Sequence, residues 1–358
     1  MCHCESINRR EHARVEASRH LLDLLRRPVV VAPMAGGPTT AALVTGAAEA
    51  GALAFLAAGY KSVETMASEV AEVRAGTSSP FGVNLFVPGA PSNDVDAISA
   101  YLATLTADAE AVGAELGAPI WDDDHFNEKI SALLANAPAA VSFAFGCPSD
   151  EVVAAFKNAG SVVVVTVTNP SEATLAARAG ADALCVQSHE AGAHRGAFTN
   201  GDAPARDVDL LSLIAEIAEV TDVPQIAAGG IMHRDQVTAA LGKGAVAVQC
   251  GTAFVRCTES GAHSAYKDAL VDPRFTKTAV TRAFSGRPAR GLVNQFMLDH
   301  SDAPRAYPEI NNATRPLRAE AAARGDVDKM SLWAGVGFRS AQDGSVGDII
   351  DRLCASSA

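Results

Sequence analysis

Eight short apolar runs recur along the chain, and stretches with helical periodicity separate them. The runs are rich in Val, Ile, Leu and Ala, and most lack the apolar–polar alternation of a strand with one wet face. Such continuous apolar runs are typical of strands in a parallel sheet, which helices cover on both faces. Several of the intervening helical segments end in Gly, as helix C-termini prefer. The runs begin at Val29, Leu53, Phe81, Val141, Val162, Ala183, Gln225 and Ala245.

This repetition predicts an α/β fold, a (β/α)8 TIM barrel with a smaller C-terminal lid subdomain. A doubly wound sheet is the alternative, because strand order is not visible in a sequence. At 358 residues the chain could hold two domains, but barrels often exceed 200 residues as one domain. We predict an N-terminal extension at 1–27, a barrel at 28–256 with an insertion at about 87–139, a lid at 257–330, and C-terminal helices at 331–358 that pack back on the barrel.

The charge balance excludes two classes of partner. The formal net charge of −12 argues against nucleic acid, which requires a basic face, and against anionic membranes. We find no apolar stretch long enough to span a bilayer and no apolar core of a signal peptide at the start.

The seven cysteines are scattered and odd in number, which favours reduced thiols and a cytoplasmic location. A metal site at Cys2 and Cys4 is not expected, because no second pair of ligands stands nearby.

Glycines follow the last two apolar runs, at Gly229–Gly230 and at Gly251–Thr252. TIM barrels place their active sites at the C-terminal ends of the strands, and often bind phosphate after strands seven and eight. Glycine lets backbone N–H groups approach an anion, and a helix N-terminus adds favourable charge. Two such corners on the two expected strands predict a phosphate site. The ligand could be a phosphosugar, a nucleotide or flavin mononucleotide (FMN).

The segment "VQSHEAGAHRG" follows the sixth run and holds two histidines, His189 and His194. They lie five residues apart with Gly192 between them, so they do not form the i, i+4 pair of a helical zinc site. We therefore predict no metal site. Histidine accepts protons near neutral pH, and small neighbours would let this loop approach a flat ligand. His194 is the candidate catalytic base, whereas a structural role is the better interpretation of His189.

Other residues near the predicted barrel mouth leave both a functional and a structural interpretation open. Cys147 could be a catalytic thiol or a packing residue, and Lys61 a ligand or a solvated side chain. In the lid, Arg287 and Arg290 could guard an anionic ligand or lie in a solvated loop.

Several motifs, in order, resemble the nitronate monooxygenases. They include "PVVVAPMAGGPTTAALVTGAAEAGALAFLAAGYKS", "PFGVNLFVPG", "VQSHEAGAHRG", "AAGGI", "QCGTAF" and "FSGRPARG", and the likeness covers roughly Pro28 to Asn294. The resemblance implies an FMN-containing barrel with a second, smaller domain. It also implies that alkyl nitronates or nitroalkanes react with dioxygen to give carbonyl compounds and nitrite.

The resemblance also implies site residues. His194 matches the catalytic histidine of the family, which commonly has two glycines before it, whereas this chain has Ala193 as the second. The residues that the resemblance assigns to FMN are Pro33, Met34, Ala35, Asn84, Gln187, Gly192, Gly229, Gly230, Gln249, Cys250, Gly251 and Thr252.

Two other functions remain open at the level of sequence. One is an FMN-dependent NAD(P)H:quinone reductase or a flavin-type enoyl-acyl-carrier-protein reductase, which would share barrel, phosphate corners and histidine. The other is a phosphate-ligand binding barrel without catalysis. For the favoured function, the partners are a small nitronate or nitroalkane and dioxygen, with a homodimer as the expected assembly.

Overall fold

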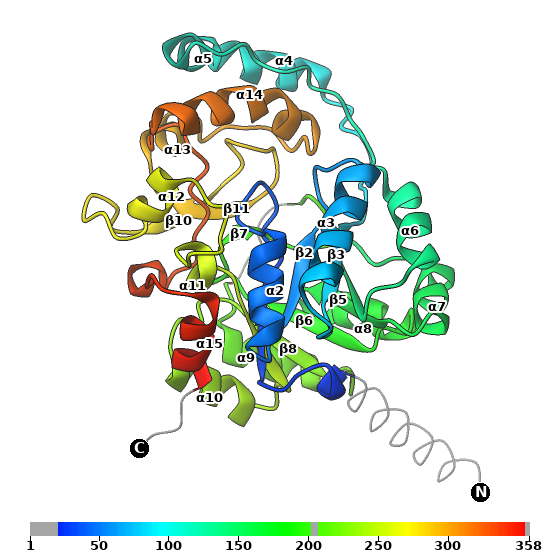
Figure 1. Cartoon of the computed structure of the whole chain (residues 1–358). Coiled ribbons are helices and arrows are strands. Elements are labelled where there is room, and N and C mark those ends of the chain that lie inside the picture. The colour runs from blue at the N-terminus through cyan, green and yellow to red at the C-terminus, as the bar shows by residue number, and fades with distance from the viewer. Residues whose placement is uncertain (1–20, 202–206, 355–358) are drawn as a thin grey trace, which may run out of the picture.

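Eight parallel strands close into a barrel in the computed structural model, which describes residues 21–201 and 207–354 (Figure 1). The closed order β1-β2-β3-β4-β5-β6-β8-β9 confirms the predicted TIM barrel and excludes the doubly wound sheet. Each strand coincides with a predicted apolar run. The barrel strands are β1 (Val29–Val31), β2 (Leu53–Ala57), β3 (Gly82–Phe86), β4 (Ala140–Ala144), β5 (Val162–Val167), β6 (Ala183–Gln187), β8 (Gln225–Ala228) and β9 (Ala247–Cys250).

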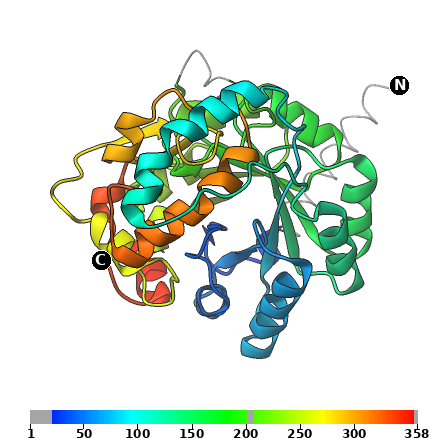
Figure 2. The ribbon, with the colours of Figure 1, turned by 90° about the horizontal axis from the view of Figure 1, so that it is seen from above.

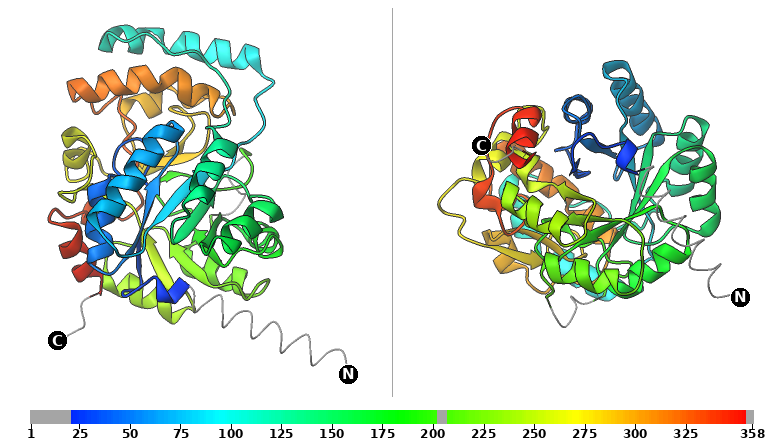
Figure 3. Two further views of the ribbon diagram at one scale, coloured as in Figure 1. Left: turned by 45° about the vertical axis from the view of Figure 1, so that its right-hand side comes forward. Right: turned by 90° about the horizontal axis from the view of Figure 1, so that it is seen from below.

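Helices surround the strands, as the view from below shows (Figure 3). Side chains at the N-termini of several helices accept a hydrogen bond from the first turn, such as Thr40 before α2 and Asp209 before α9. These helices bury the outer faces of the strands, which explains why the runs are apolar throughout. They are α2 (Ala41–Glu49), α3 (Val63–Gly76), α6 (Phe126–Ala135), α7 (Asp150–Asn158), α8 (Pro170–Arg178), α9 (Leu210–Ala218), α10 (Arg234–Gly242), α11 (Thr252–Val255) and α15 (Val346–Cys354).

The lid region contains a small antiparallel sheet that the sequence did not predict. Its order is β10 (Thr278–Thr281), β11 (Ala289–Leu292) and β7 (Ala193–His194). Because β7 belongs to the loop after β6, the sheet joins the lid to the barrel. The remaining lid helices are α12 (Ser264–Ala269), α13 (Gln295–Asp299) and α14 (Glu309–Arg324).

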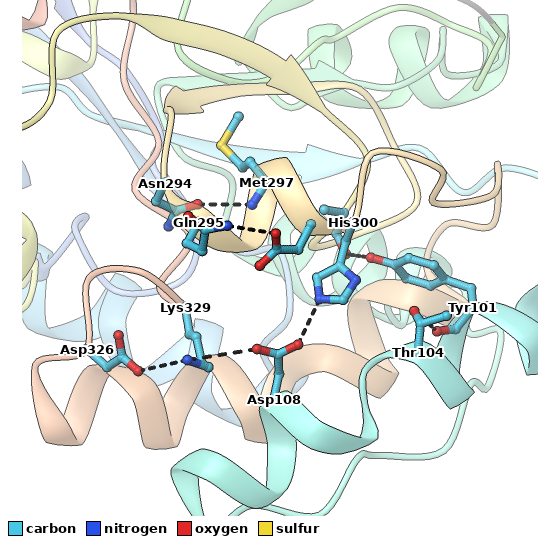
Figure 4. Close-up of polar contacts among 11 residues, drawn as sticks. Tyr101, Thr104, Asp108, Asn294, Gln295, Met297, His300, Asp326 and Lys329 are labelled. Atoms are coloured by element: carbon cyan, nitrogen blue, oxygen red, sulfur yellow. Dashed lines mark hydrogen bonds and ion pairs between the residues drawn. The ribbon is translucent and has the colours of Figure 1, made fainter.

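The insertion places α4 (Val95–Thr104) and α5 (Thr106–Val112) above α14, and these helices cross over the barrel mouth (Figures 2 and 3). Asp108 of α5 fixes this arrangement, because its carboxylate lies between His300 and Lys329 (Figure 4). Its oxygens are 2.8 Å from His300 Nε2 and 3.8 Å from Lys329 Nζ. Two layers of helices therefore cover the barrel mouth: α14, and α4 with α5 above it.

One predicted helix is wrong. The segment "SLWAGVGFRSAQ" forms no α-helix, only a 3-10 turn at Phe338–Ser340. Its backbone bonds instead to β11, where Leu292 N donates to Leu332 O at 2.9 Å and Ala334 N donates to Arg290 O at 3.2 Å. The glycines in the segment also disfavour a helix.

Some predictions are not tested. Cys2 and Cys4 lie outside the described residues. The domain boundaries at 27, 256 and 330 stay a prediction. Among the described residues, no helix combines the length and apolar character needed to cross a membrane.

A buried ion pair between Asp124 and Lys129 stabilises the end of β2, and we predict that Asp124→Asn lowers the free energy of unfolding by about 3–5 kcal/mol. Lys129 Nζ lies 2.8 Å from the Asp124 carboxylate and donates to Ala58 O at 3.0 Å. The same carboxylate accepts the backbone N–H of Tyr60 at 2.9 Å. The substitution would leave the buried ammonium without a counter-charge. Urea unfolding, followed by circular dichroism, measures the loss.

The control is Glu320→Gln, which removes the exposed pair with Arg324 on α14. We expect that change to cost at most about 1 kcal/mol. Equal losses in the two variants would contradict the stabilising role of the buried pair.

Candidate active site

A cavity of about 540 Å³ lies where the barrel strands end, beneath the lid. Every residue that the sequence assigned to the site lines this cavity, although its ligand role stays a prediction. The lining includes His194, Pro33, Met34, Ala35, Asn84, Gln187, Gly192, Gly229, Gly230, Gln249, Cys250, Gly251 and Thr252.

His194 is held in place by backbone pairing with the lid. In the β7–β11 ladder, His194 lies opposite Ala289, and Arg195 N donates to Pro288 O at 2.8 Å. Gln187, at the end of β6, spans the loop from the barrel side. Its amide donates to His194 O at 3.2 Å and accepts from Gly196 N at 2.7 Å. The histidine is therefore fixed between a barrel strand and the lid sheet.

Arg287 and Arg290 bind the same loop rather than a ligand. Neither lines the cavity. Arg287 donates to Arg195 O at 3.3 Å and to Ala197 O, and its guanidinium carbon lies 4.1 Å from the centroid of the Phe145 ring. Arg290 donates to His189 O at 2.9 Å. These arginines hold the backbone carbonyls of the segment that carries His194.

The His194 imidazole lies among aromatic rings and one hydroxyl. Its Nε2 is 2.8 Å from Ser285 Oγ, and its ring centroid is 5.4 Å from that of Trp333 and 5.7 Å from that of Tyr307. Desolvation, aided by the positive charges of Arg287 and Arg318, lowers the pKa of His194 to about 3. The imidazole is therefore neutral at physiological pH.

Glycines at the ends of β8 and β9 form another part of the cavity wall. Gly229 and Gly230 have φ of 133° and 68°, a region that favours glycine. A Cβ on Gly229 would lie 2.3 Å from Ser188 Oγ. Thr252 Oγ1 accepts the N–H of Gly335 at 3.0 Å, so its own hydroxyl proton can be donated elsewhere. This corner has uncovered backbone and a hydroxyl, which suits a phosphate oxygen.

Three residues around the cavity have positive φ without being glycine: Tyr60 (67°), Phe145 (73°) and Ala193 (64°). This region costs an L-residue energy, and such strain clusters at functional sites. At Ala193 it explains the glycine that the resembling family commonly has there.

The other residues with open roles lie outside the cavity lining. Lys61 pairs with Glu69 at 2.6 Å. The Cys147 thiol is half-buried, and burial raises its pKa to about 11, which makes it a poor nucleophile at neutral pH. His189 Nδ1 lies 2.8 Å from Val208 O, in agreement with the structural role favoured for it.

The sequence analysis missed several lining residues. Phe86 ends a barrel strand and Phe145 follows one, so the rule that placed the site could have found them. Arg315 and Arg318 come from α14, far beyond the last barrel strand, and no sequence signal placed that helix over the mouth.

With fold and cavity established, comparison with known proteins identifies the family. The model of the family described as "Nitronate monooxygenase" matches residues 18–356. The chain belongs to the nitronate monooxygenase family. The enzyme named nitronate monooxygenase from Pseudomonas aeruginosa is 38% identical over 92% of this chain and 95% of its own length. A probable nitronate monooxygenase from Bacillus subtilis is 36% identical over 92% of this chain and 96% of its length.

Solved structures agree with this assignment. The nitroalkane oxidase of Streptomyces ansochromogenes superposes with a TM-score of 0.90 at 44% identity, covering 94% of this chain and 97% of that one. FabK from Thermotoga maritima gives a TM-score of 0.70 at 25% identity, over 92% of this chain and 93% of its own. The nitronate monooxygenase resemblance in the sequence is thereby confirmed.

We predict that Ala193→Gly leaves the free energy of unfolding unchanged or raises it by up to about 1 kcal/mol. Glycine removes the cost of a side chain at φ 64°, which offsets the greater freedom of the unfolded chain. The matched control is Ala71→Gly, on the exposed face of α3, which should lose about 1 kcal/mol. Urea unfolding compares them, and an equal loss at Ala193 would refute the strain.

We also predict that His194 stays neutral from pH 8 down to pH 5, because its pKa is lowered to about 3 from the usual 6.5. A lowered pKa means that protonation requires a lower pH than in an ordinary histidine. Nitrogen-15 NMR of labelled histidines measures this, and the spectrum of His194→Asn identifies the resonances that belong to His194. Protonation of those resonances with a midpoint near 6.5 would contradict the desolvated environment.

Proposed function

We propose that the protein is an FMN-dependent nitronate monooxygenase, which oxidises alkyl nitronates with dioxygen to carbonyl compounds and nitrite. The observation that carries this proposal is one cavity with the glycine corners of β8 and β9 and the imidazole of His194 in its wall. Membership of the nitronate monooxygenase family supports the same reaction.

The residues present fit FMN. Gly229, Gly230 and Gly251 leave backbone exposed to the cavity, and the Thr252 hydroxyl can donate to a phosphate oxygen. A Cβ on Gly229 would clash with Ser188, so the corner is shaped by the absence of side chains. Pro33 and Met34 at the end of β1 supply an apolar surface for a flat ring. When bound, FMN would supply the electron acceptance and the reaction with dioxygen.

The chain's own residues hold and orient the substrate. The lid, with α4 and α5 above its helix α14, covers the barrel mouth, which limits access of water (Figure 2). Phe86, Phe145 and Trp333 give the cavity apolar walls suited to a small alkyl group. His194 Nε2 is engaged with Ser285, which leaves Nδ1 as the nitrogen that can exchange a proton with a bound ligand.

The low pKa of His194 favours the nitronate over the neutral nitroalkane as substrate. A neutral imidazole with a pKa of about 3 is a weak acceptor for a proton on carbon. A nitronate arrives already deprotonated, and its negative charge would stabilise any proton that His194 gains. Where a neutral nitroalkane does enter, His194 is the group placed to remove its α-proton. The homodimer stays a prediction.

Anaerobic flavin reduction tests the proposal. The purified protein should be yellow, and an alkyl nitronate should bleach the flavin in the absence of oxygen, whereas NADH should leave it oxidised over the same period. Spectra at about 450 nm follow both reactions.

Each alternative has its own outcome. Fast bleaching by NADH without bleaching by nitronate would replace the proposal with a reductase. A colourless protein that takes up no added FMN would indicate a barrel that binds another phosphate ligand.

A further inference from the structure

One face of α14 lines the cavity. Asn311, Arg315, Arg318, Ala319 and Ala322 are spaced by four, three, one and three residues, which places them on one side of the helix. These α14 side chains have no role in the proposed function. This face brings two guanidinium groups to the cavity that also contains His194.

Arg318 is half-buried, and its hydrogen bonds go to neutral groups. Its Nη2 donates to Asn311 O and to Asn311 Oδ1, both at 2.9 Å, and its Nε donates to Thr314 Oγ1 at 3.2 Å. Burial lowers its pKa to about 10, so the guanidinium still carries its charge at neutral pH.

No carboxylate among the described residues pairs with this charge. The ion pairs of residues 21–201 and 207–354 include neither Arg315 nor Arg318. Arg315 donates to Asn312 Oδ1 at 3.2 Å and lies 5.7 Å from the centroid of the Tyr60 ring. Arg315 is exposed, whereas Arg318 is half-buried and desolvation lowers its pKa. A partly desolvated cation without a counter-ion attracts an anion, so the cavity favours a negatively charged ligand.

A purely structural role explains only part of this arrangement. Pro316 interrupts the hydrogen bonding of α14, and Arg318 bonds to the Asn311 carbonyl about two turns earlier. A neutral amide side chain could make that bond without the cost of partly desolvating a charge. The charge itself therefore requires another reason.

The side chains around His194 indicate where the anion would lie. The charge of Arg318 contributes to the lowered pKa of His194, and the ring centroid of Tyr307 is 5.7 Å from that of His194. The Tyr307 hydroxyl is 2.9 Å from the Tyr60 hydroxyl, and both tyrosines interact electrostatically with Arg318. We propose that Arg318, with Arg315 beside it, holds the anionic nitronate group of the substrate against His194 and selects it over the neutral nitroalkane. This inference rests on the proposed function and adds the residues that recognise the charge.

The test compares Arg318→Gln with Arg324→Gln. Arg324 is on the same helix but is exposed and paired with Glu320, so the control removes the same charge outside the cavity. In the holoenzyme, Arg318→Gln should lower kcat/KM for nitronate by about 10- to 100-fold, mainly through KM. The value for the neutral nitroalkane should change less than about threefold, and Arg324→Gln should match the wild type for both substrates. A nitronate KM unchanged in Arg318→Gln would overturn the proposal.

Anion binding gives a readout independent of turnover. Nitrate, a planar anion with the same N–O geometry, should bind the wild-type holoenzyme in calorimetry and should bind at least about tenfold more weakly to Arg318→Gln. Should that variant fail to fold, Arg315→Gln takes its place, with the same weakening expected. The absence of nitrate binding by the wild type, or equal binding by the variant, would overturn the proposal.

The two levels of inference fail separately. A wild-type protein that binds nitrate through Arg318 but does not oxidise nitronates would support the anion site at Arg318 and refute the proposed function. A protein that oxidises nitronates with no dependence on Arg315 or Arg318 would support the proposed function and refute the anion site.

Discussion

The short antiparallel pairing between β7 and β11 is the contact on which the candidate site depends. The barrel brings eight strand ends to one mouth, but a loop after β6 would not by itself point a histidine in a fixed direction. Three contacts give that direction: the pairing of β7 with the lid sheet, the two hydrogen bonds of the Gln187 amide to the loop, and the hydrogen bonds of Arg287 to the loop carbonyls. The lid therefore helps to form the candidate site as well as covering it.

The electrostatics of the cavity follow from the same assembly. The lid buries Arg287 and half-buries Arg318, and no acid among the described residues pairs with Arg318. The positive charges and the desolvation together keep His194 neutral. An anionic nitronate fits both the arginines and the neutral His194. Its charge compensates the positive charges of the arginines, and it does not require a strong base because it is already deprotonated. This combination favours chemistry on a preformed nitronate.

The fold could be predicted from the sequence because barrel strands buried on both faces leave an unmistakable apolar pattern. The glycine corners after β8 and β9 and His194 could be placed because the barrel topology fixes where strand ends meet. The structure of the lid was harder to predict from the sequence. The β7 strand is two residues long, and its pairing partner lies almost a hundred residues away, so local pattern carries no trace of it. For the same reason, Arg287 and Arg290 gave no sign that they bind backbone carbonyls. The segment around Trp333 was predicted to be helical, but its glycines disfavour a helix and its backbone bonds to β11 instead.

We propose that a flavin phosphate binds between the ends of β8 and β9 with the His194 imidazole facing the flavin ring. A crystal structure of the protein purified with its flavin tests this arrangement. We expect phosphate density in hydrogen-bonding contact with the backbone of Gly229–Gly230 and Gly251–Thr252, and the imidazole on the open face of the ring. Phosphate density elsewhere in the barrel, or a His194 side chain turned away from the ring, would contradict it.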